Sequence, residues 1–380
     1  MSFTSPYLIF SLVFFVLVLL LIPRRLFSTV SVFLLFLFLI YFSPYSAILF
    51  FITTSLTFYI YRLKQEKYLI PGIIVLVVIF ILFKIQFIGT FTNPILALGY
   101  PIGLSYFLVR NIHFLFEAYK DNLTSVRFID FVAYSGFFPA YFTGPIHRVQ
   151  PFLKDLSNHS FSVQNISEGF ERILYGYVKI IFLANFLVST FFVFRLGALQ
   201  ETHPALFQYL DCVRYGANLY FLFAGYSDVA IGVSLILGIR LPENFNFPFL
   251  AKNINDFWKR WHISLSEWCR DYVFKPVFAQ TRIFPVAIML TLLAIGLWHE
   301  FSLRYIVWAI YHGAGIALWQ YVDKRKLFRF SDPSTITAYL VRFLSVVITV
   351  HFVILSFCIT KEDSIQQAWF AFTQLFSFIK

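Results

Sequence analysis

His299 is an ionisable residue near the end of an apolar stretch, in the sequence GLWHE (296–300). It lies about 15 residues into that stretch, or roughly 22 Å along a helix that rises 1.5 Å per residue. Ionisable side chains within membrane segments are costly and by default indicate a functional site. Because imidazole titrates near neutral pH, it is suited to act as a general base. The sequence therefore predicts acid–base chemistry at His299, with an inert histidine at the outer membrane interface as the alternative.

A second histidine, His262, lies in the sequence DFWKRWHISLSEWCRDYVF (256–274). At 100° per residue this segment has an aromatic side and a charged side. The aromatic side carries Trp258, Trp261, His262, Leu265 and Trp268. The charged side carries Asp256, Lys259, Arg260, Glu267, Arg270 and Asp271. Because tryptophan favours membrane interfaces, the pattern predicts an amphipathic helix over 256–271 in the plane of the cytoplasmic membrane surface. His262 is then either a functional residue or a hydrogen-bonded core residue.

Two shorter sequences also bring charge into or beside apolar stretches. Asp228 ends GYSD (225–228), and His147 and Arg148 end TGPIHR (143–148). A carboxylate within an apolar stretch needs a partner. Both sequences are compatible with a functional role and equally with loops that carry interfacial charges.

Signatures of several other chemistries are missing from this sequence. It has no H-E-x-x-H, no G-x-S-x-G, no phosphate-binding Walker loop and no G-x-G-x-x-G. The 8 histidines have no metal-ligand spacing, and the 3 cysteines lie far apart without a C-x-x-C pair. We therefore expect no metal site, no disulfide framework and no bound cofactor.

The composition indicates the elements that must position these residues. Of 380 residues, 59% are hydrophobic and 13% are charged, whereas soluble domains average about a quarter charged residues. The chain is therefore expected to be an all-α, polytopic integral membrane protein and not a soluble enzyme. Its net charge of +11 comes from short basic clusters between apolar stretches. This distribution is typical of cytoplasmic membrane loops, so we expect no nucleic-acid partner.

About eleven membrane segments are expected in a single domain, since about 20 residues cross a bilayer. The stretch 27–61 is too long for one span, and Ser43-Pro44 is expected to divide it. The apolar stretches are 1–22, 27–61, 68–89, 96–119, 128–144, 169–198, 204–222, 224–239, 283–301, 303–322 and 336–360. The segment 361–380 is expected to be amphipathic from its residue pattern. The first stretch is expected to be retained as a span, because its charges follow the apolar residues.

Basic clusters give the expected orientation, with the N-terminus outside. The positive-inside rule places in the cytoplasm Arg24-Arg25, Arg62 to Lys67, Lys259-Arg260, and Lys324-Arg325-Lys326 with Arg329. The segment 283–301 then runs outward and 303–322 runs inward. His262 is expected near the cytoplasm and His299 in the outward half.

Several ordered sequence blocks together resemble the membrane-bound O-acyltransferase (MBOAT) family, in its bacterial branch. The resemblance covers about 100–357 through PIGLSYF (101–107), FFPAYFTGPIHR (137–148), FAGYSDVAIG (223–232), LPENFNFPFLAKNINDFWKRWHISLSEWCRDYVF (241–274), GLWHE (296–300), the span around His312 and HFVILSF (351–357). It implies a ring of tilted helices around a central tunnel, with 1–95 as N-terminal spans, 96–360 as the family's core and 361–380 as a C-terminal segment. In the family the histidine corresponding to His299 is catalytic, and the one corresponding to His262 lines the same reaction path.

The chain departs from the family pattern at two places. The family usually has glycine after the catalytic histidine, where this chain has Glu300. That carboxylate could orient the imidazole, or it could face solvent. The segment KPVFA (275–279) lacks a Gly-Gly pair found in alginate-type members, which favours the members that transfer D-alanine to teichoic acid.

The resulting hypothesis is a multi-pass O-acyltransferase of the cytoplasmic membrane. It would move an acyl group, D-alanyl or acetyl, from a cytoplasmic thioester to hydroxyls of an extracytoplasmic polymer such as teichoic acid or polysaccharide. The thioester, on a carrier protein's phosphopantetheine or as acetyl-CoA, is a co-substrate, and a membrane or extracytoplasmic partner protein is expected. His299 and His262 are the predicted catalytic residues. Residues predicted to line the tunnel or position the donor are Trp258, Trp261, Trp298, Asn244, Asn246, Asp228 and Ser264; those predicted to dock it are Lys259, Arg260 and Arg270.

Two other classes of protein remain as alternatives. A transporter or flippase could use Asp228, His262 and His299 to relay protons, although transporters often contain inverted repeats and the sequence shows no internal repeat. A non-catalytic protein that binds acyl groups could keep the same fold and both histidines.

Overall fold

The computed structural model describes residues 5–86, 100–120, 122–123, 125–158, 161–325 and 336–375, and this part of the chain is helical apart from connecting segments and one isolated bridge. The predicted cytoplasmic residues Lys326 and Arg329 lie outside the described residues, as do parts of the expected segments 68–89, 96–119 and 361–380. The chain forms two compact units, one made of 1–178 and 225–242 and the other of 179–224 and 243–380.

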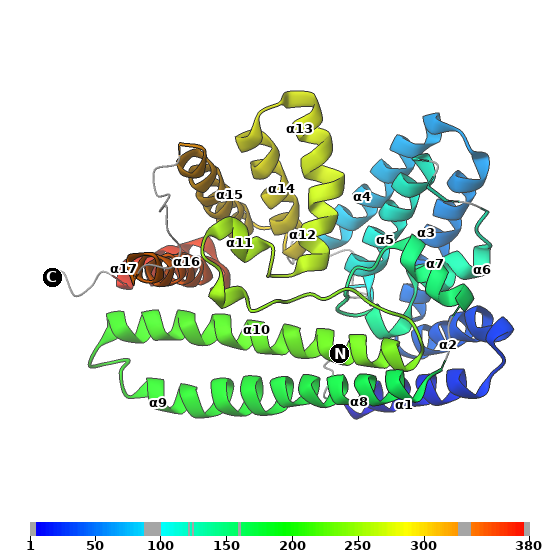
Figure 1. Ribbon diagram of the computed structural model, residues 1–380, viewed down its shortest axis with the longest axis horizontal. Coiled ribbons are helices and arrows are strands. Elements are labelled where there is room, and N and C mark those ends of the chain that lie inside the picture. Colours follow the sequence, from blue (N-terminus) through cyan, green and yellow to red (C-terminus); the bar gives the residue numbers. More distant parts are fainter. Residues whose placement is uncertain are drawn as a thin grey trace. The chain divides into compact units, whose positions relative to one another are not determined.

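The first unit contains most of the N-terminal helices (Figure 1). They are α1 (Pro6–Leu21), η1 (Arg24–Leu26), α2 (Phe27–Phe42), α3 (Pro44–Leu63), η2 (Glu66–Tyr68), α4 (Leu69–Gln86), α5 (Leu104–Tyr119), α6 (Phe128–Ser135), η4 (Phe138–Ala140), α7 (Val149–Asn158) and α8 (Val163–Tyr177). The predicted break at Ser43-Pro44 is confirmed, because α2 ends at Phe42 and α3 begins at Pro44. Proline lacks the N–H that would continue α2 but is well suited to the first turn of α3.

The second unit contains the helices that carry both predicted catalytic histidines. They are the π-helical η5 (Val178–Phe192), which begins at the unit boundary, α9 (Val193–Gly197), η6 (Pro248–Leu250), α11 (Ile254–Trp258), α12 (Ile263–Cys269), η7 (Arg270–Phe274), α13 (Lys275–Thr281), α14 (Phe284–His299), α15 (Leu303–Lys324), α16 (Ile336–Lys361) and α17 (Ile365–Gln374). The long helix α10 (Pro204–Ile236) begins in the second unit and ends in the first.

Six helices in the described residues are long and apolar enough to cross a membrane. They span Arg24–Phe42, Pro44–Leu63, Glu66–Ile85, Val163–Gly197, Pro204–Ile236 and Ile336–Lys361. Shorter apolar helices lie at Pro6–Leu21, Phe128–Ala140 and Phe284–His299. The all-α membrane character is therefore confirmed, whereas the count of about eleven segments is not.

The expected division between 204–222 and 224–239 is wrong, because α10 continues through it for 33 residues. A single glycine such as Gly225 costs a helix only about 1 kcal/mol, so it does not by itself end one. In the first unit, glycines also permit α8 and the end of α10 to pack closely. A Cβ added at Gly169 would lie 2.6 Å from the carbonyl oxygen of Gly232.

The expected continuous helix over 256–271 is also wrong. α11 ends at Trp258 and α12 begins at Ile263, with His262 between them at a φ of 42°. The left-handed conformation ends a helix because non-glycine residues adopt it only singly. The predicted sidedness holds in part. Trp258, Trp261, His262 and Leu265 are buried and Lys259 and Arg270 are exposed, but Trp268 is half-buried, as are Asp256, Arg260, Glu267 and Asp271 of the charged side.

Candidate active site

The turn that holds His262 is fixed by an extended segment of the same unit. Phe245 forms an isolated antiparallel bridge with Trp261, and the backbone N–H of Ile263 donates to the carbonyl of Asn244 over 2.9 Å. The hydroxyl of Ser264 donates to Oδ1 of Asn244 over 2.6 Å, and both residues are buried. Asn244 and Ser264 thus fix the backbone on both sides of His262, whose left-handed conformation needs such support.

The side chain of Asn246 does not share this burial. It is exposed, and the backbone N–H and carbonyl of Asn246 bond to Arg260 instead. Arg260 also forms an ion pair with Asp256 at 2.9 Å. These contacts show Asn246 and Arg260 holding the outer edge of the turn.

His299 occupies the last position of α14, where the helix packs closely against α15. A Cβ added at Gly296 would lie 2.7 Å from the carbonyl oxygen of Tyr305, so glycine permits this approach. The ring of His299 stacks on that of Tyr305 with centroids 5.9 Å apart. The side chain of His299 is exposed, whereas that of His262 is only 2% exposed.

The two predicted catalytic histidines lie together, although they come from different elements. Their ring centroids are 6.2 Å apart. Trp298 lies beside both, with centroid distances of 5.7 Å to His262 and 5.0 Å to His299. Phe223 of α10 packs edge-on against His262 at 4.6 Å. Two imidazoles of contrasting exposure therefore share one aromatic cluster.

Burial gives His262 a distinct electrostatic state. Desolvation lowers the pKa of His262 well below its ordinary value, and the nearby His299 lowers it further. The imidazole is therefore neutral at neutral pH and offers one hydrogen-bond donor and one acceptor. Neither of its nitrogens has a hydrogen-bond partner among the described residues. Because buried polar groups are nearly always paired, His262 is available to bind or to exchange a proton with another molecule.

Glu300 follows His299 and binds an arginine in the next helix. Nη2 of Arg304 donates to its Oε2 over 2.6 Å and Nε donates to its Oε1 over 3.1 Å. Arg304 also donates to the carbonyl of Thr360 in α16 over 3.3 Å. The carboxylate therefore connects the end of α14 to α15 and, through Arg304, to α16.

A cavity of about 260 Å³ lies in the same unit. Polar and charged side chains at its lining include Asn255, Lys259, Ser266, Glu267 and Arg270, while Trp258 and residues of α14 and α15 supply apolar lining. Arg270 lies 3.6 Å from Glu267 and 3.5 Å from Asp271 and is half exposed. The cavity thus combines a charged rim with an apolar wall that includes Trp258.

The family model described as membrane-bound O-acyltransferase matches residues 67–360. The chain belongs to the MBOAT family. In the described residues of this MBOAT chain, no group of three or more His, Cys, Asp or Glu side chains is placed to hold a metal ion.

Several relatives have names that state a function. A Pseudomonas aeruginosa protein named "Probable alginate O-acetylase AlgI" is 33% identical over 288 residues, covering 73% of this chain and 52% of that protein. A Bacillus subtilis "Teichoic acid D-alanyltransferase" is 33% identical over 277 residues, 68% of each. A Helicobacter pylori "Peptidoglycan O-acetyltransferase" is 27% identical over 302 residues, covering 70% of this chain and 55% of that protein. The MBOAT chain spans about half the length of the alginate relatives. Because identity to the acetylase and to the alanyltransferase is equal, the D-alanyl preference stays a prediction.

Asp228, a carboxylate within an apolar stretch, forms an ion pair with an arginine of a neighbouring helix. In the first unit of the MBOAT chain, Nε of Arg172 in α8 lies 2.7 Å from Oδ1 of Asp228. Asp228 is 3% exposed. A buried carboxylate paired in this way has a structural explanation independent of any role in a reaction.

The segment TGPIHR (143–148), which carries His147 and Arg148, is held by local contacts in the first unit. His147 is buried, and its Nε2 lies 3.2 Å from the carbonyl oxygen of Tyr134. Gly144 adopts a φ of 81° that suits glycine. The sequence is therefore a structured turn.

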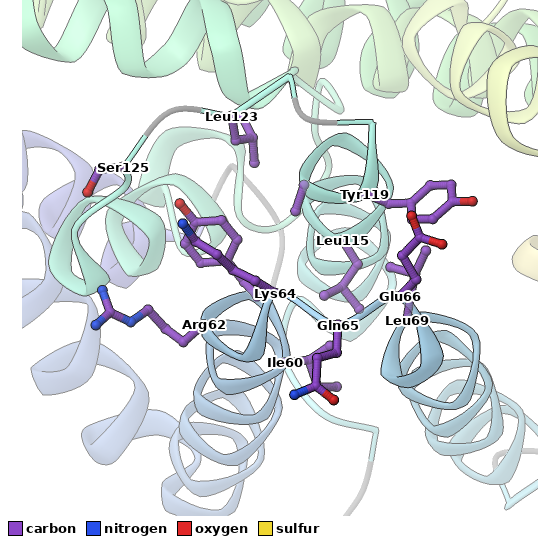
Figure 2. Close-up of a pocket in the computed structure, with 12 residues that line it drawn as sticks. Ile60, Arg62, Lys64, Gln65, Glu66, Leu69, Leu115, Tyr119, Leu123 and Ser125 are labelled. Atoms are coloured by element: carbon purple, nitrogen blue, oxygen red, sulfur yellow. The ribbon is translucent and has the colours of Figure 1, made fainter.

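A larger cavity, of about 420 Å³, lies in the first unit of the MBOAT chain (Figure 2). Its lining combines exposed charges at the α3–α4 connection, Arg62, Lys64 and Glu66, with Leu115 and Tyr119 of α5. The lining residues that the structure describes include no histidine, cysteine or serine–histidine pair suited to acyl transfer. Size alone therefore does not identify the reactive site of this MBOAT chain.

Sequence reasoning missed His312 and Trp308 as site residues. His312 is 1% exposed, and its ring lies 4.8 Å from Trp308 and 5.5 Å from Trp258 between centroids. Trp308 in turn lies 6.3 Å from His299. The signal was present in the sequence, since Trp308 and His312 are four residues apart and therefore share one face of an apolar helix.

Proposed function

We propose that this MBOAT chain is an O-acyltransferase that transfers an acyl group from a cytoplasmic thioester to hydroxyls of an extracytoplasmic polymer. The observation that carries the proposal is the pair of imidazoles 6.2 Å apart, one of them buried with unpartnered nitrogens among the described residues. Family membership supports the reaction class, and the names of the relatives, an alginate O-acetylase and a teichoic acid D-alanyltransferase, support a cell-surface polymer as acceptor.

In the proposed reaction His299 is the general base. Its neutral imidazole takes the proton of the acceptor hydroxyl as the oxygen attacks the thioester carbonyl carbon. The tetrahedral intermediate collapses by breaking the C–S bond, and the proton passes to the leaving thiolate. The products are an ester and a free thiol, so atoms and charges balance. Donors near the oxyanion, such as an N–H of His262 or of a tryptophan, stabilise it.

The proposed donor is an acyl thioester of a carrier protein or of coenzyme A. Both carry phosphate groups, and Lys259 and Arg270 offer positive charge at the rim of the 260 Å³ cavity. A D-alanyl or acetyl group would enter from this rim. We also propose a membrane or extracytoplasmic partner protein that presents the polymer.

The proposed setting is the cytoplasmic membrane, crossed by about eleven segments that surround a tunnel. Residues 1–380 would form one integral-membrane domain, with the matched family region spanning both compact units. The N-terminal spans would cover 1–95, the MBOAT core 96–360 and the C-terminal segment 361–380.

The alternatives are less well supported. A proton-relaying transporter would use Asp228, which instead pairs with Arg172. A non-catalytic acyl-binding protein would have no need of a second imidazole beside the first, and the experiment below separates it from an enzyme.

Mass spectrometry of cell-surface polymers tests the proposal. Polymers from cells that produce the chain should carry an acyl mass, acetyl or alanyl, that is missing from cells without it. Cells that produce His299→Ala should match the cells without the chain, and cells that produce the control His203→Ala should match the wild type. A wild-type polymer without any acyl difference would refute the enzymatic function, and a His299→Ala polymer with normal acylation would refute the role of His299.

A further inference from the structure

Two of the three cysteines, which lie far apart in the sequence, meet in the second unit. Cys212 of α10 and Cys358 of α16 are 146 residues apart in the chain, yet their Sγ atoms are 2.7 Å apart. Both side chains are 0% exposed. Even carbon atoms that are not bonded prefer a separation of about 3.5–4.0 Å, and sulfur is larger. The two thiols therefore lie nearer than packing requires and need little movement to reach an S–S bond, which is about 2.05 Å long.

Contacts on both sides of the cysteine pair hold α10 against α16. Nζ of Lys361 lies 2.5 Å from Oδ2 of Asp211, the residue before Cys212. The hydroxyl of Tyr215, about one helical turn further along α10, donates to the carbonyl of Thr360 over 3.4 Å. The two sulfurs are thus brought together by interactions in which neither sulfur takes part.

The predicted orientation places the cysteine pair toward the extracytoplasmic side. The positive-inside rule assigns Lys324 and Arg325, at the end of α15, to the cytoplasm. The helix α16 follows α15 in the chain, so it begins on that side and carries Cys358 near its outer end. Cysteine pairs outside the cytoplasm are oxidised to disulfides, whereas thiols in the cytoplasm stay reduced. A disulfide also suits a buried apolar position, because it has no S–H donor left to satisfy.

We propose that Cys212 and Cys358 form a disulfide that joins α10 to α16 on the extracytoplasmic side. Each thiol loses its hydrogen as the S–S bond forms, and two electrons and two protons pass to a thiol–disulfide oxidoreductase, whose own disulfide becomes a dithiol. Because both sulfurs are buried once the helices have packed, oxidation takes place while the helices assemble. The link closes a long loop and so stabilises the folded chain mainly by restricting the unfolded one. This inference goes beyond the proposed acyl transfer and does not depend on it.

Counting the thiols that react with N-ethylmaleimide tests the proposal. Cells that produce the full chain are quenched with trichloroacetic acid, which stops thiol exchange, and the protein is alkylated in denaturant and weighed by mass spectrometry. The wild-type chain has three cysteines and should carry one adduct, at Cys269, but three adducts when it is reduced before alkylation. A proteolytic digest of the unreduced protein should contain peptides linked between Cys212 and Cys358. Three adducts without reduction, or a link that includes Cys269, would overturn the proposal.

Serine variants of the three cysteines provide matched controls. Cys212→Ser and Cys358→Ser should each carry two adducts with or without reductant, because each removes one half of the link. Cys269→Ser changes a buried cysteine of α12 and should keep the link, with no adduct before reduction and two after it. Fewer than two adducts on unreduced Cys212→Ser or Cys358→Ser would show indiscriminate oxidation and would overturn the specific pairing. The count in the wild type needs no variant, so it decides the matter even if one of these chains fails to insert.

Thermal unfolding in detergent tests the stabilising role of the link. Wild-type chain purified from cells grown with dithiothreitol, in which the link cannot form, should unfold at least about 5 °C below the oxidised chain, since the unfolded state then gains the freedom of a long loop. Growth with dithiothreitol should leave the midpoint of the double variant Cys212→Ser, Cys358→Ser unchanged and should lower that of Cys269→Ser as in the wild type. Equal midpoints for the oxidised wild type and for wild type that carries three adducts would refute the stabilising role.

Discussion

The two central histidines differ in the environment of their rings. His262 is buried between Phe223 and Trp298, whereas His299 is exposed at the end of α14. An exposed imidazole can meet an acceptor hydroxyl, and a buried neutral imidazole can hold a donor group without competition from water. This contrast favours His299 as the base and His262 as the residue that positions the acyl group.

Substitution of His299 by alanine should remove the general base. Transfer activity should fall by about 10²- to 10⁴-fold, the usual contribution of general-base catalysis. The measurement is single-turnover transfer from a thioester donor by purified protein. His203→Ala, which removes a histidine from an exposed connection in the same unit, should stay within about twofold of wild type. A loss of similarly small size in His299→Ala would contradict the role of His299 as the general base.

Burial of His262 should make the stability of the protein depend on pH. Its pKa is lower in the folded protein than the unfolded value of about 6.5. Below that value the unfolded state binds a proton that the folded state does not, so the free energy of unfolding falls as the pH falls. The contribution of His262 approaches about 1.4 kcal/mol per pH unit until the lowered pKa is reached.

Thermal unfolding of wild type and His262→Phe between pH 8 and 5 measures this contribution. The difference between the two should be constant above about pH 7 and should shift in favour of the variant at lower pH. His203→Phe controls for the loss of any histidine. Parallel curves for wild type and His262→Phe would show that the folded protein accommodates a charged His262.

At the scale of elements, the sequence predicted segment types better than segment ends. Apolar length and Ser43-Pro44 located α2 and α3, because both depend on local sequence. The break at His262 is held by hydrogen bonds from the Ile263 N–H and the Ser264 hydroxyl to Asn244, which is distant in the sequence, so helical periodicity does not reveal it. The continuity of α10 was likewise undecided by the sequence, since Gly225 alone is compatible with a break and with a continuous helix.

The site shows the same division between local and long-range information. Spacing predicted that Trp258 and His262 share the buried side of their segment. It could not predict that Trp308 and His312 of α15 reach Trp258, because that contact depends on how α11 and α15 pack. The pairing of Glu300 with Arg304 is a local feature, because the two residues are four apart, although the sequence left both an orienting and a solvent-facing role open for Glu300.

The close crossing of α8 and α10 should tolerate no side chain at its centre. Gly232→Ala would place a Cβ against the carbonyl oxygen of Gly169, and backbone cannot move aside cheaply. We expect the free energy of unfolding to fall by about 1–3 kcal/mol. The control is Gly197→Ala in α9, where an added Cβ meets nothing within 4 Å. Equal stability of both variants in urea or thermal unfolding would contradict the close approach of α8 and α10 at Gly232.

The ion pair between Glu300 and Arg304 should couple the ends of α14 and α15. Both side chains are partly exposed, at 30% and 13%, so solvent screening limits the coupling to about 0.5–1 kcal/mol. A double-mutant cycle with Glu300→Gln and Arg304→Gln measures it from three unfolding free energies relative to wild type. Additive effects of the two substitutions would show that the pair contributes nothing to stability.

At the scale of the whole molecule, basic residues have two competing roles. The positive-inside rule assigns cytoplasmic clusters to orientation and to anionic lipid, worth about 1 kcal/mol per residue near the surface. Donor docking requires in addition that the charges lie where a thioester enters. Lys259 and Arg270 line the cavity beside Trp258, whereas Arg62 and Lys64 line the separate cavity of Figure 2. These two pairs of residues therefore offer a matched comparison.

Charge reversal at each pair separates the two roles. Lys259→Glu with Arg270→Glu should raise the apparent KM for the thioester donor, more strongly at low salt, because exposed charges act mainly on association rate. Arg62→Glu with Lys64→Glu changes the net charge by the same amount and should leave that KM within about twofold. Both double variants should insert into membranes, as judged by yield and by one-sided labelling of an added cysteine.

If the two double variants raise the apparent KM equally, the effect is general electrostatic attraction and not docking at this cavity. If Lys259→Glu with Arg270→Glu instead loses insertion while the surviving protein keeps its KM, these residues anchor the chain to lipid and donor docking at the cavity rim is refuted.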